Sequence, residues 1–103
     1  MKYTDRAMSL IAKERERQLR LWGDQINNHP FEWVSILGEE YGELCQAINE
    51  TFFTAPQHPE RGGIANIERE AVQIAAVAIQ IIEVMERQKE SEWRRGIFFN
   101  ETT

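Results

Sequence analysis

The sequence contains few residues that break helices or cross-link chains. Its 103 residues include one cysteine, three prolines and six glycines. Cys45 is the lone cysteine, so no disulfide can form within the chain, and the N-terminal segment lacks the apolar core of a signal peptide. We therefore expect a protein of the reducing cytoplasm. No apolar run is long enough to cross a bilayer, so we expect no membrane partner.

Positive charge is also scarce in this chain. Twelve Lys and Arg residues stand against seventeen Asp and Glu residues, which gives a formal net charge of −5. This balance argues against direct nucleic-acid binding through a basic face, and a polyanionic ligand would need a cation as a bridge. With 42% hydrophobic and 28% charged residues, the composition suits one globular helical domain over residues 1–103.

The strongest helix breakers are confined to the middle of the chain. All three prolines and the Gly62-Gly63 pair lie between residues 30 and 63. Apolar spacing predicts helices over about 5–22, 30–53 and 64–89, with residues 54–63 as a loop. Thr4 and Gly23 are the expected caps of the first helix, and Pro30 belongs to the first turn of the second. The expected core stripes of the first two helices are Met8, Ile11, Ala12, Leu19 and Trp22, then Leu37, Tyr41, Leu44, Ile48 and Phe52.

The third predicted helix is apolar on nearly every side. Between residues 74 and 85 only Gln80 and Glu83 are polar, so more than one face must be covered. Two other helices hardly suffice, and we expect a homo-oligomer, most simply a dimer joined through the second and third helices. The predicted fold class is all-α: a bundle of three long helices plus a short C-terminal segment, completed by homo-oligomerisation.

Two pairs of polar side chains border the predicted core stripes. Glu40 and Glu43 lie three residues apart on the second helix, and Glu70 and Gln73 lie three apart on the third. If these helices pack antiparallel, the two pairs face one another. Gathered carboxylates repel, and a divalent ion removes the conflict. Mg²⁺ suits an open oxygen cluster beside a polyphosphate, with Mn²⁺ as an alternative. The competing interpretation is a solvated acidic face.

The order of these residues resembles that of a known superfamily. Segment 39–43 (EEYGE) is similar to the EExxE element of the MazG-like all-α nucleotide pyrophosphohydrolases, which include dCTP pyrophosphatase and dimeric dUTPase relatives. Segment 70–73 (EAVQ) falls where that superfamily has ExxD, and residues 14–30 resemble the lead-in of small phage and prophage MazG-like proteins. The resemblance covers about residues 14–86. It implies a fold of four or five helices, a dimer or tetramer, and Mg²⁺-dependent hydrolysis of a nucleoside triphosphate to the monophosphate and pyrophosphate.

The resemblance also implies roles for the acidic residues. Glu40, Glu43 and Glu70 occupy the positions of metal ligands, and Gln73 is a neutral amide where the superfamily has an aspartate. Glu39, the first acid of the element, is an additional ligand or orients the attacking water. The predicted catalytic residues are therefore Glu39, Glu40 and Glu43.

Candidates for the rest of a nucleotide site are fewer and have competing structural roles. Aromatic rings stack on bases, and Asn or His side chains read base edges. The candidates near the ends of the second helix are Trp22, Asn28, His29, Trp33 and Phe53. The alternatives are core packing for the aromatic residues and a helix cap for His29. Arg94 and Arg95 would replace the basic segment that holds phosphate in several relatives, or belong to a solvated tail.

Three functions remain open at this point. The first is the pyrophosphohydrolase, and the second is a non-catalytic nucleotide- or protein-binding module with a degenerate metal site. The third is a structural helical module that assembles through the third helix. The base and sugar of the substrate are left open by the sequence.

Overall fold

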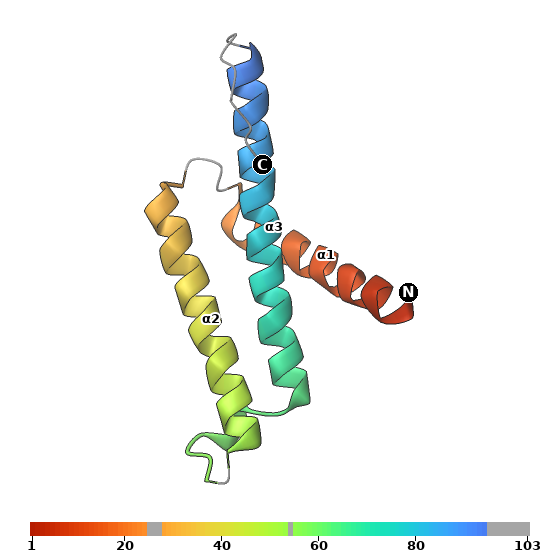
Figure 1. Ribbon diagram of the computed structural model, residues 1–103, viewed down its shortest axis with the longest axis vertical. Coiled ribbons are helices and arrows are strands. Elements are labelled where there is room, and N and C mark those ends of the chain that lie inside the picture. Colours follow the sequence, from red (N-terminus) through yellow and green to blue (C-terminus); the bar gives the residue numbers. More distant parts are fainter. Residues whose placement is uncertain (25–27, 54, 95–103) are drawn as a thin grey trace.

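The computed structural model describes residues 1–24, 28–53 and 55–94, with the side chains of residues 92–94 outside the description. Three long helices follow one another: α1 (Lys2–Trp22), α2 (Pro30–Phe52) and α3 (Ile64–Arg94), with the short 3₁₀ helix η1 (Pro59–Arg61) before α3. Figure 1 shows α2 and α3 running antiparallel, with α1 crossing α3 at an angle. The all-α prediction is confirmed, and the described residues contain three long helices where the resemblance implied four or five. The expected C-terminal segment lies outside the described residues.

The ends of α2 form as the sequence predicts. Pro30 occupies the first turn, and the Nδ1 atom of His29 accepts a hydrogen bond from the backbone N–H of Phe31 at 3.2 Å. The helix ends at Phe52, and the backbone N–H of Phe53 still donates to the carbonyl of Asn49. His29 is therefore the N-cap of α2, the structural role that the sequence allowed for it.

The ends of α1 and α3 differ partly from the prediction. α1 begins at Lys2, with Met1 in place of Thr4 as N-cap, and ends at Trp22. Its C-cap is Gly23, as predicted, and the φ of 69° at Gly23 lies in the left-handed region that favours glycine. α3 begins at Ile64 as expected but continues to Arg94, five residues past the predicted end. No proline or glycine interrupts residues 64–94, so no residue there stops the helix.

The loop between α2 and α3 is tied back to the end of α2. The hydroxyl of Thr51 accepts from the backbone N–H of Gly63 at 2.7 Å, and a carboxylate oxygen of Glu50 accepts from the backbone N–H of His58 at 2.9 Å. Gly62 passes so close that an added Cβ would lie 2.9 Å from the backbone carbonyl atoms of Glu50. These contacts fix where α3 begins relative to α2.

The core forms where α3 meets both other helices. Trp33, Val77 and Val84 make its centre, with Ile36, Leu37 and Ile81 packed around them. Ala76 on α3 is fully buried. α1 contacts α3 and is fastened by an ion pair between Arg15 Nε and Glu83 Oε1 at 2.6 Å. The prediction that α3 is covered on more than one side is confirmed.

The packed faces of α1 and α2 are rotated from the expected stripes. On α1, Met8, Leu19 and Trp22 are exposed, and the partly or fully buried positions include Ile11, Glu14 and Gln18. On α2, Tyr41, Ile48 and Phe52 are exposed, and the buried stripe is Trp33, Leu37, Glu40, Leu44 and Ala47. Ile11, Leu37 and Leu44 are partly buried as expected, whereas polar residues take inward positions on both helices that a count of apolar residues did not predict.

One side of the α2/α3 pair remains apolar and exposed. In each helix, the residue that follows a core residue lies about 100° further round the helix axis. Because α2 and α3 are antiparallel, these following residues face the same side of the pair in both helices. We call this side the open apolar face, formed by Val34, Tyr41, Ile48, Ala78, Ile82 and Met85, all exposed. α1 covers α3 on the opposite side, where Ala76 is buried. No helix in the described part of the chain has both the length and the apolar character to cross a membrane.

Candidate functional site: a carboxylate cluster between two cavities

Polar residues interrupt the buried stripes of α2 and α3 at the same level of the bundle. Glu40 lies between Leu37 and Leu44 at spacings of three and four residues, so it turns toward α3 with the core. Glu70 and Gln73 precede Val77 on α3 at spacings of seven and four, so they turn toward α2. The antiparallel packing brings the two sets together, as the sequence predicted.

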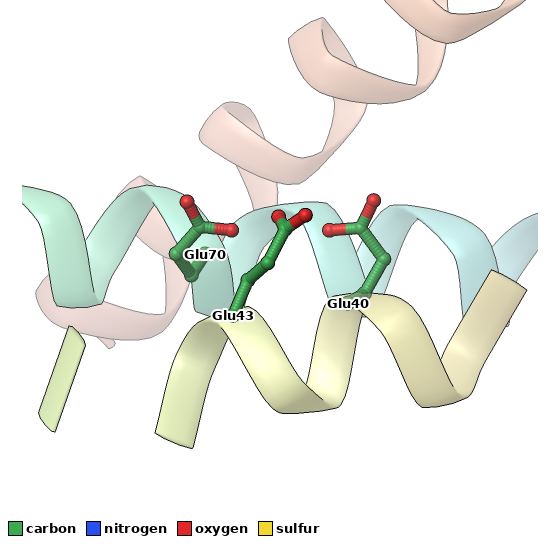
Figure 2. Close-up of side chains that lie close together, drawn as sticks. All are labelled: Glu40, Glu43 and Glu70. Atoms are coloured by element: carbon green, nitrogen blue, oxygen red, sulfur yellow. The ribbon is translucent and has the colours of Figure 1, made fainter. Parts of the chain in front are cut away.

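Three carboxylates form a compact cluster at this level. One carboxylate oxygen from each of Glu40, Glu43 and Glu70 lies within 4.8 Å of the others. Figure 2 shows the three side chains pointing to the same side, Glu40 and Glu43 from α2 and Glu70 from α3. Glu40 and Glu70 are half-buried, whereas Glu43 is exposed. We call these three residues the acidic cluster.

Gln73 joins the cluster through its amide nitrogen. In the orientation that satisfies its hydrogen bonds, Nε2 donates to Glu70 Oε2 at 2.9 Å and to Glu40 Oε2 at 3.2 Å. The amide thus supplies two donors between two carboxylates and offsets part of their repulsion. For its carbonyl oxygen to bind a metal, Gln73 would have to give up both hydrogen bonds.

Two members of the cluster, Glu40 and Glu70, hold protons more tightly than ordinary carboxylates do. Burial raises the pKa of Glu40 to about 7, with further contributions from the negative charges of Glu43 and Glu70. Burial also raises the pKa of Glu70, and its hydrogen bond with Glu43 acts in the same direction. Desolvation and like charge both disfavour the ionised form. A bound cation would remove this conflict.

The oxygen positions fit a divalent cation with a small adjustment. Mg²⁺ binds oxygens at 2.0–2.1 Å, so two ligands on opposite sides of the ion lie about 4.2 Å apart. The oxygens of the acidic cluster lie within 4.8 Å of one another, so a contraction of at most about 0.6 Å, within reach of side-chain rotation, would bring them to this separation. Glu40, Glu43 and Glu70 are therefore able to hold such an ion, and the remaining coordination positions stay open for water or phosphate.

A cavity lies on each side of the acidic cluster. The first, of about 260 Å³, includes Glu40 in its wall and is called here the Gln18 cavity. The second, of about 350 Å³, includes Glu43 and Glu70 together with Arg61 and Arg69, and is called the Arg61/Arg69 cavity. The Gln18 cavity is lined by Gln18, Trp22, Ile36, Glu39, Glu40, Val77 and Gln80. The cluster thus separates a partly apolar cavity from one that contains two guanidinium groups.

The other predicted site residues lie away from the cluster or have structural contacts. Trp33 is 5% exposed in the core, and Phe53 is exposed at the far end of α2. His29 is about 16 Å from Glu40 along the helix axis, by the rise of 1.5 Å per residue, and its ring stacks on Phe31. Asn28 is half-buried just before α2. Of the remaining candidates, Glu39 and Trp22 line the Gln18 cavity. The side chain of Arg94 and all of Arg95 lie outside the described residues.

Sequence reasoning missed Gln18, Arg61 and Arg69. Gln18 lies seven residues after Ile11, a spacing that places it on the same face of α1, but an amide was not counted toward an apolar stripe. Arg69 directly precedes Glu70, and Arg61 lies in the loop, where helical spacing gives no information. Comparison of the chain with protein-family models, curated proteins and solved structures finds no match.

Proposed function

We propose that this protein hydrolyses a nucleoside triphosphate to the monophosphate and pyrophosphate with the help of Mg²⁺. The observation that carries the proposal is the acidic cluster, whose three carboxylates from two helices meet between a partly apolar cavity and a polar one that Arg61 and Arg69 help to line. A cation at the cluster would be the bridge that an acidic chain needs to bind a polyphosphate. The order of motifs that resembles the MazG-like superfamily supports the same reaction.

Each group at the site has a defined task in this reaction. Glu40, Glu43 and Glu70 would hold the cation, which would supply charge neutralisation for the phosphates and lower the pKa of a bound water. Arg61 and Arg69 attract the phosphate chain on the Glu43 side of the cluster. Glu39, exposed and one residue from Glu40, accepts a proton from the water that attacks the α-phosphorus. The bond between the α-phosphorus and the bridging oxygen breaks, and pyrophosphate leaves.

A second candidate is a nucleotide-binding protein without catalysis. The hydrogen bonds from Gln73 Nε2 to Glu70 and Glu40 favour it, because the amide takes over part of the neutralising role of a cation. In this case the cluster binds a nucleotide weakly or only with metal, and no phosphate bond is broken.

The protein also acts as a homo-oligomer in this proposal. The open apolar face carries large side chains from α2 and α3, including Val34, Tyr41 and Ile82, with no cover in the described part of the chain. Apolar patches of this kind on soluble proteins commonly mark interaction sites. A second copy, packing its own α2 and α3 on this face, buries both patches and leaves the acidic cluster, on the α1 side, accessible.

Pyrophosphate release tests the proposal directly. Wild type, Glu40→Gln and Gln73→Asp are assayed with canonical and modified ribo- and deoxyribonucleoside triphosphates, in Mg²⁺ and in Mn²⁺. We expect release by the wild type, loss of at least a hundredfold in Glu40→Gln, and an increase in Gln73→Asp, which restores an anionic ligand. Binding without product in both the wild type and Gln73→Asp would instead support the non-catalytic function.

A further inference from the structure

The Gln18 cavity has the size and walls of a pocket for one ring. Its volume of about 260 Å³ is below the range of about 300–1,000 Å³ typical of pockets for whole drug-sized ligands. Trp22, Ile36 and Val77 contribute apolar surface from α1, α2 and α3, respectively. A flat heteroaromatic group would bury its faces against such walls. The cavity opens beside Glu40, so a ring bound there lies next to the acidic cluster.

Gln18 lines this cavity and carries an acceptor that has no partner in the described part of the chain. The side chain is 4% exposed, and its Nε2 donates to Glu14 Oε2 at 3.0 Å. Glu14 is held in turn by two hydrogen bonds of 2.8 Å from Arg17, so the amide nitrogen has a fixed partner. The carbonyl oxygen Oε1 is buried with no hydrogen-bond partner among the described residues. Buried acceptors are seldom left unpaired, so a ligand that donates a hydrogen bond to Oε1 would satisfy it.

Two carboxylates of the cavity also favour a ligand that donates. Glu39 and Glu40 line the same cavity, and their carboxylates accept hydrogen bonds when ionised. An exocyclic amino group carries two N–H donors, whereas a carbonyl at the same ring position would face these acceptors with a lone pair. Gln18 Oε1 and the two carboxylates would therefore favour an amino-substituted ring over its oxo counterpart.

We propose that the Gln18 cavity binds the amino-substituted heteroaromatic ring of a phosphorylated ligand, with Gln18 Oε1 accepting a hydrogen bond from the amino group and the Trp22 ring packing on its face. The phosphates of this ligand then lie at the acidic cluster. The identity of the ligand as a nucleotide rests on the proposed function, but the preference for an amino group does not require hydrolysis.

Calorimetric titration of the full chain with monophosphates tests the proposal without any reaction. The probes are deoxycytidine against deoxyuridine monophosphate, deoxyadenosine against deoxyinosine monophosphate, and deoxyribose 5-phosphate, which lacks a ring. We expect at least one amino member to bind about tenfold more tightly than its oxo partner, the effect of one lost hydrogen bond at a buried acceptor. Equal affinity within both pairs, or no binding of any base-bearing probe, would overturn the proposal.

Substitutions then assign the preference to the cavity. Gln18→Met keeps the length of the side chain but removes the acceptor, and should reduce the amino preference to near one without changing the affinity for deoxyribose 5-phosphate. Gln88→Met makes the same change at an exposed position of α3 and should retain the preference. An unchanged preference in Gln18→Met would overturn the assignment.

A second variant keeps the test valid if Gln18→Met does not fold. Trp22 is 58% exposed, so Trp22→Leu should fold, and it should weaken binding of the preferred base about tenfold through lost stacking. Undiminished binding in Trp22→Leu would contradict the proposal. An amino preference in a protein that releases no pyrophosphate would refute the proposed hydrolysis alone, and release without any amino preference would refute the cavity inference alone.

Discussion

Without divalent cations, the protein should lose stability as the pH rises from 5 to 8. The pKa of Glu40 in the folded protein is about 7, above its ordinary value of 4.5, because of burial and the neighbouring carboxylates. Folding therefore takes up a proton between these two pKa values. The stability that protonated Glu40 provides is complete below about pH 4.5 and is lost as the pH rises through about 7. Glu70, whose pKa is also raised, adds to the loss.

The size of this loss follows from the shift of Glu40. One pKa unit corresponds to about 1.4 kcal/mol, so a rise from 4.5 to about 7 corresponds to about 3 kcal/mol in the absence of solvent screening. Glu40 is half-buried, and screening reduces the expected effect to about 1–2 kcal/mol. For a domain of this size that is a fall in melting temperature of about 5–10 °C. Saturating Mg²⁺ should reverse the fall at pH 8, because it binds the folded state alone.

Thermal melting in chelator at pH 5 and pH 8, repeated with Mg²⁺, measures the effect. Glu40→Gln should remove most of the pH dependence, since the amide has no proton to release. Glu68→Gln, which removes an exposed carboxylate of α3, should behave like the wild type. The reasoning is refuted if Glu40→Gln keeps the full pH dependence, or if the metal-free wild type becomes more stable toward pH 8.

Three further results are expected. Gln73→Asp places a fourth carboxylate beside Glu40 and Glu70, so it should lower the melting temperature in chelator and raise the Mg²⁺ affinity about tenfold. If neither value changes, the Gln73 amide does not offset the repulsion between these carboxylates. Trp33→Ala in the core should lower the free energy of unfolding in urea by about 3–5 kcal/mol, whereas Trp22→Ala should lower it by less than about 1 kcal/mol. Equal losses would be inconsistent with the burial of Trp33 and the exposure of Trp22. Ile82→Glu on the open apolar face should shift the mass in light scattering toward a single chain, and a wild type that is already monomeric would disprove the oligomer.

Much of the fold could be predicted because local rules decide it. Pro30, Gly23 and the Gly62-Gly63 pair mark helix ends through backbone conformation, and each marks an end in the structure. The rotation of the packed faces could not be predicted, because it depends on tertiary partners. Gln18 and Glu40 turn toward the core, whereas the apolar pattern predicted this position for Leu19 and Tyr41, the residues that follow them.

The pairing of the carboxylates was also predictable, from helix spacing and antiparallel packing alone. Glu40, Glu43 and Glu70 lie together because three- and four-residue spacings return to one helix face. The two cavities could not be predicted, since both depend on how the three helices and the loop are placed. Arg61, at the end of η1, and Gln18, on a helix distant in sequence, reach the site only through that placement.

The most direct test of the account is a calorimetric titration of Mg²⁺ and Mn²⁺ into the metal-free protein. The wild type should bind one or two ions per chain, Glu70→Gln should bind at least tenfold more weakly, and Glu68→Gln should match the wild type. If the wild type binds neither ion, or if Glu70→Gln binds as tightly as the wild type, the acidic cluster is not a cation site and the proposed reaction falls with it.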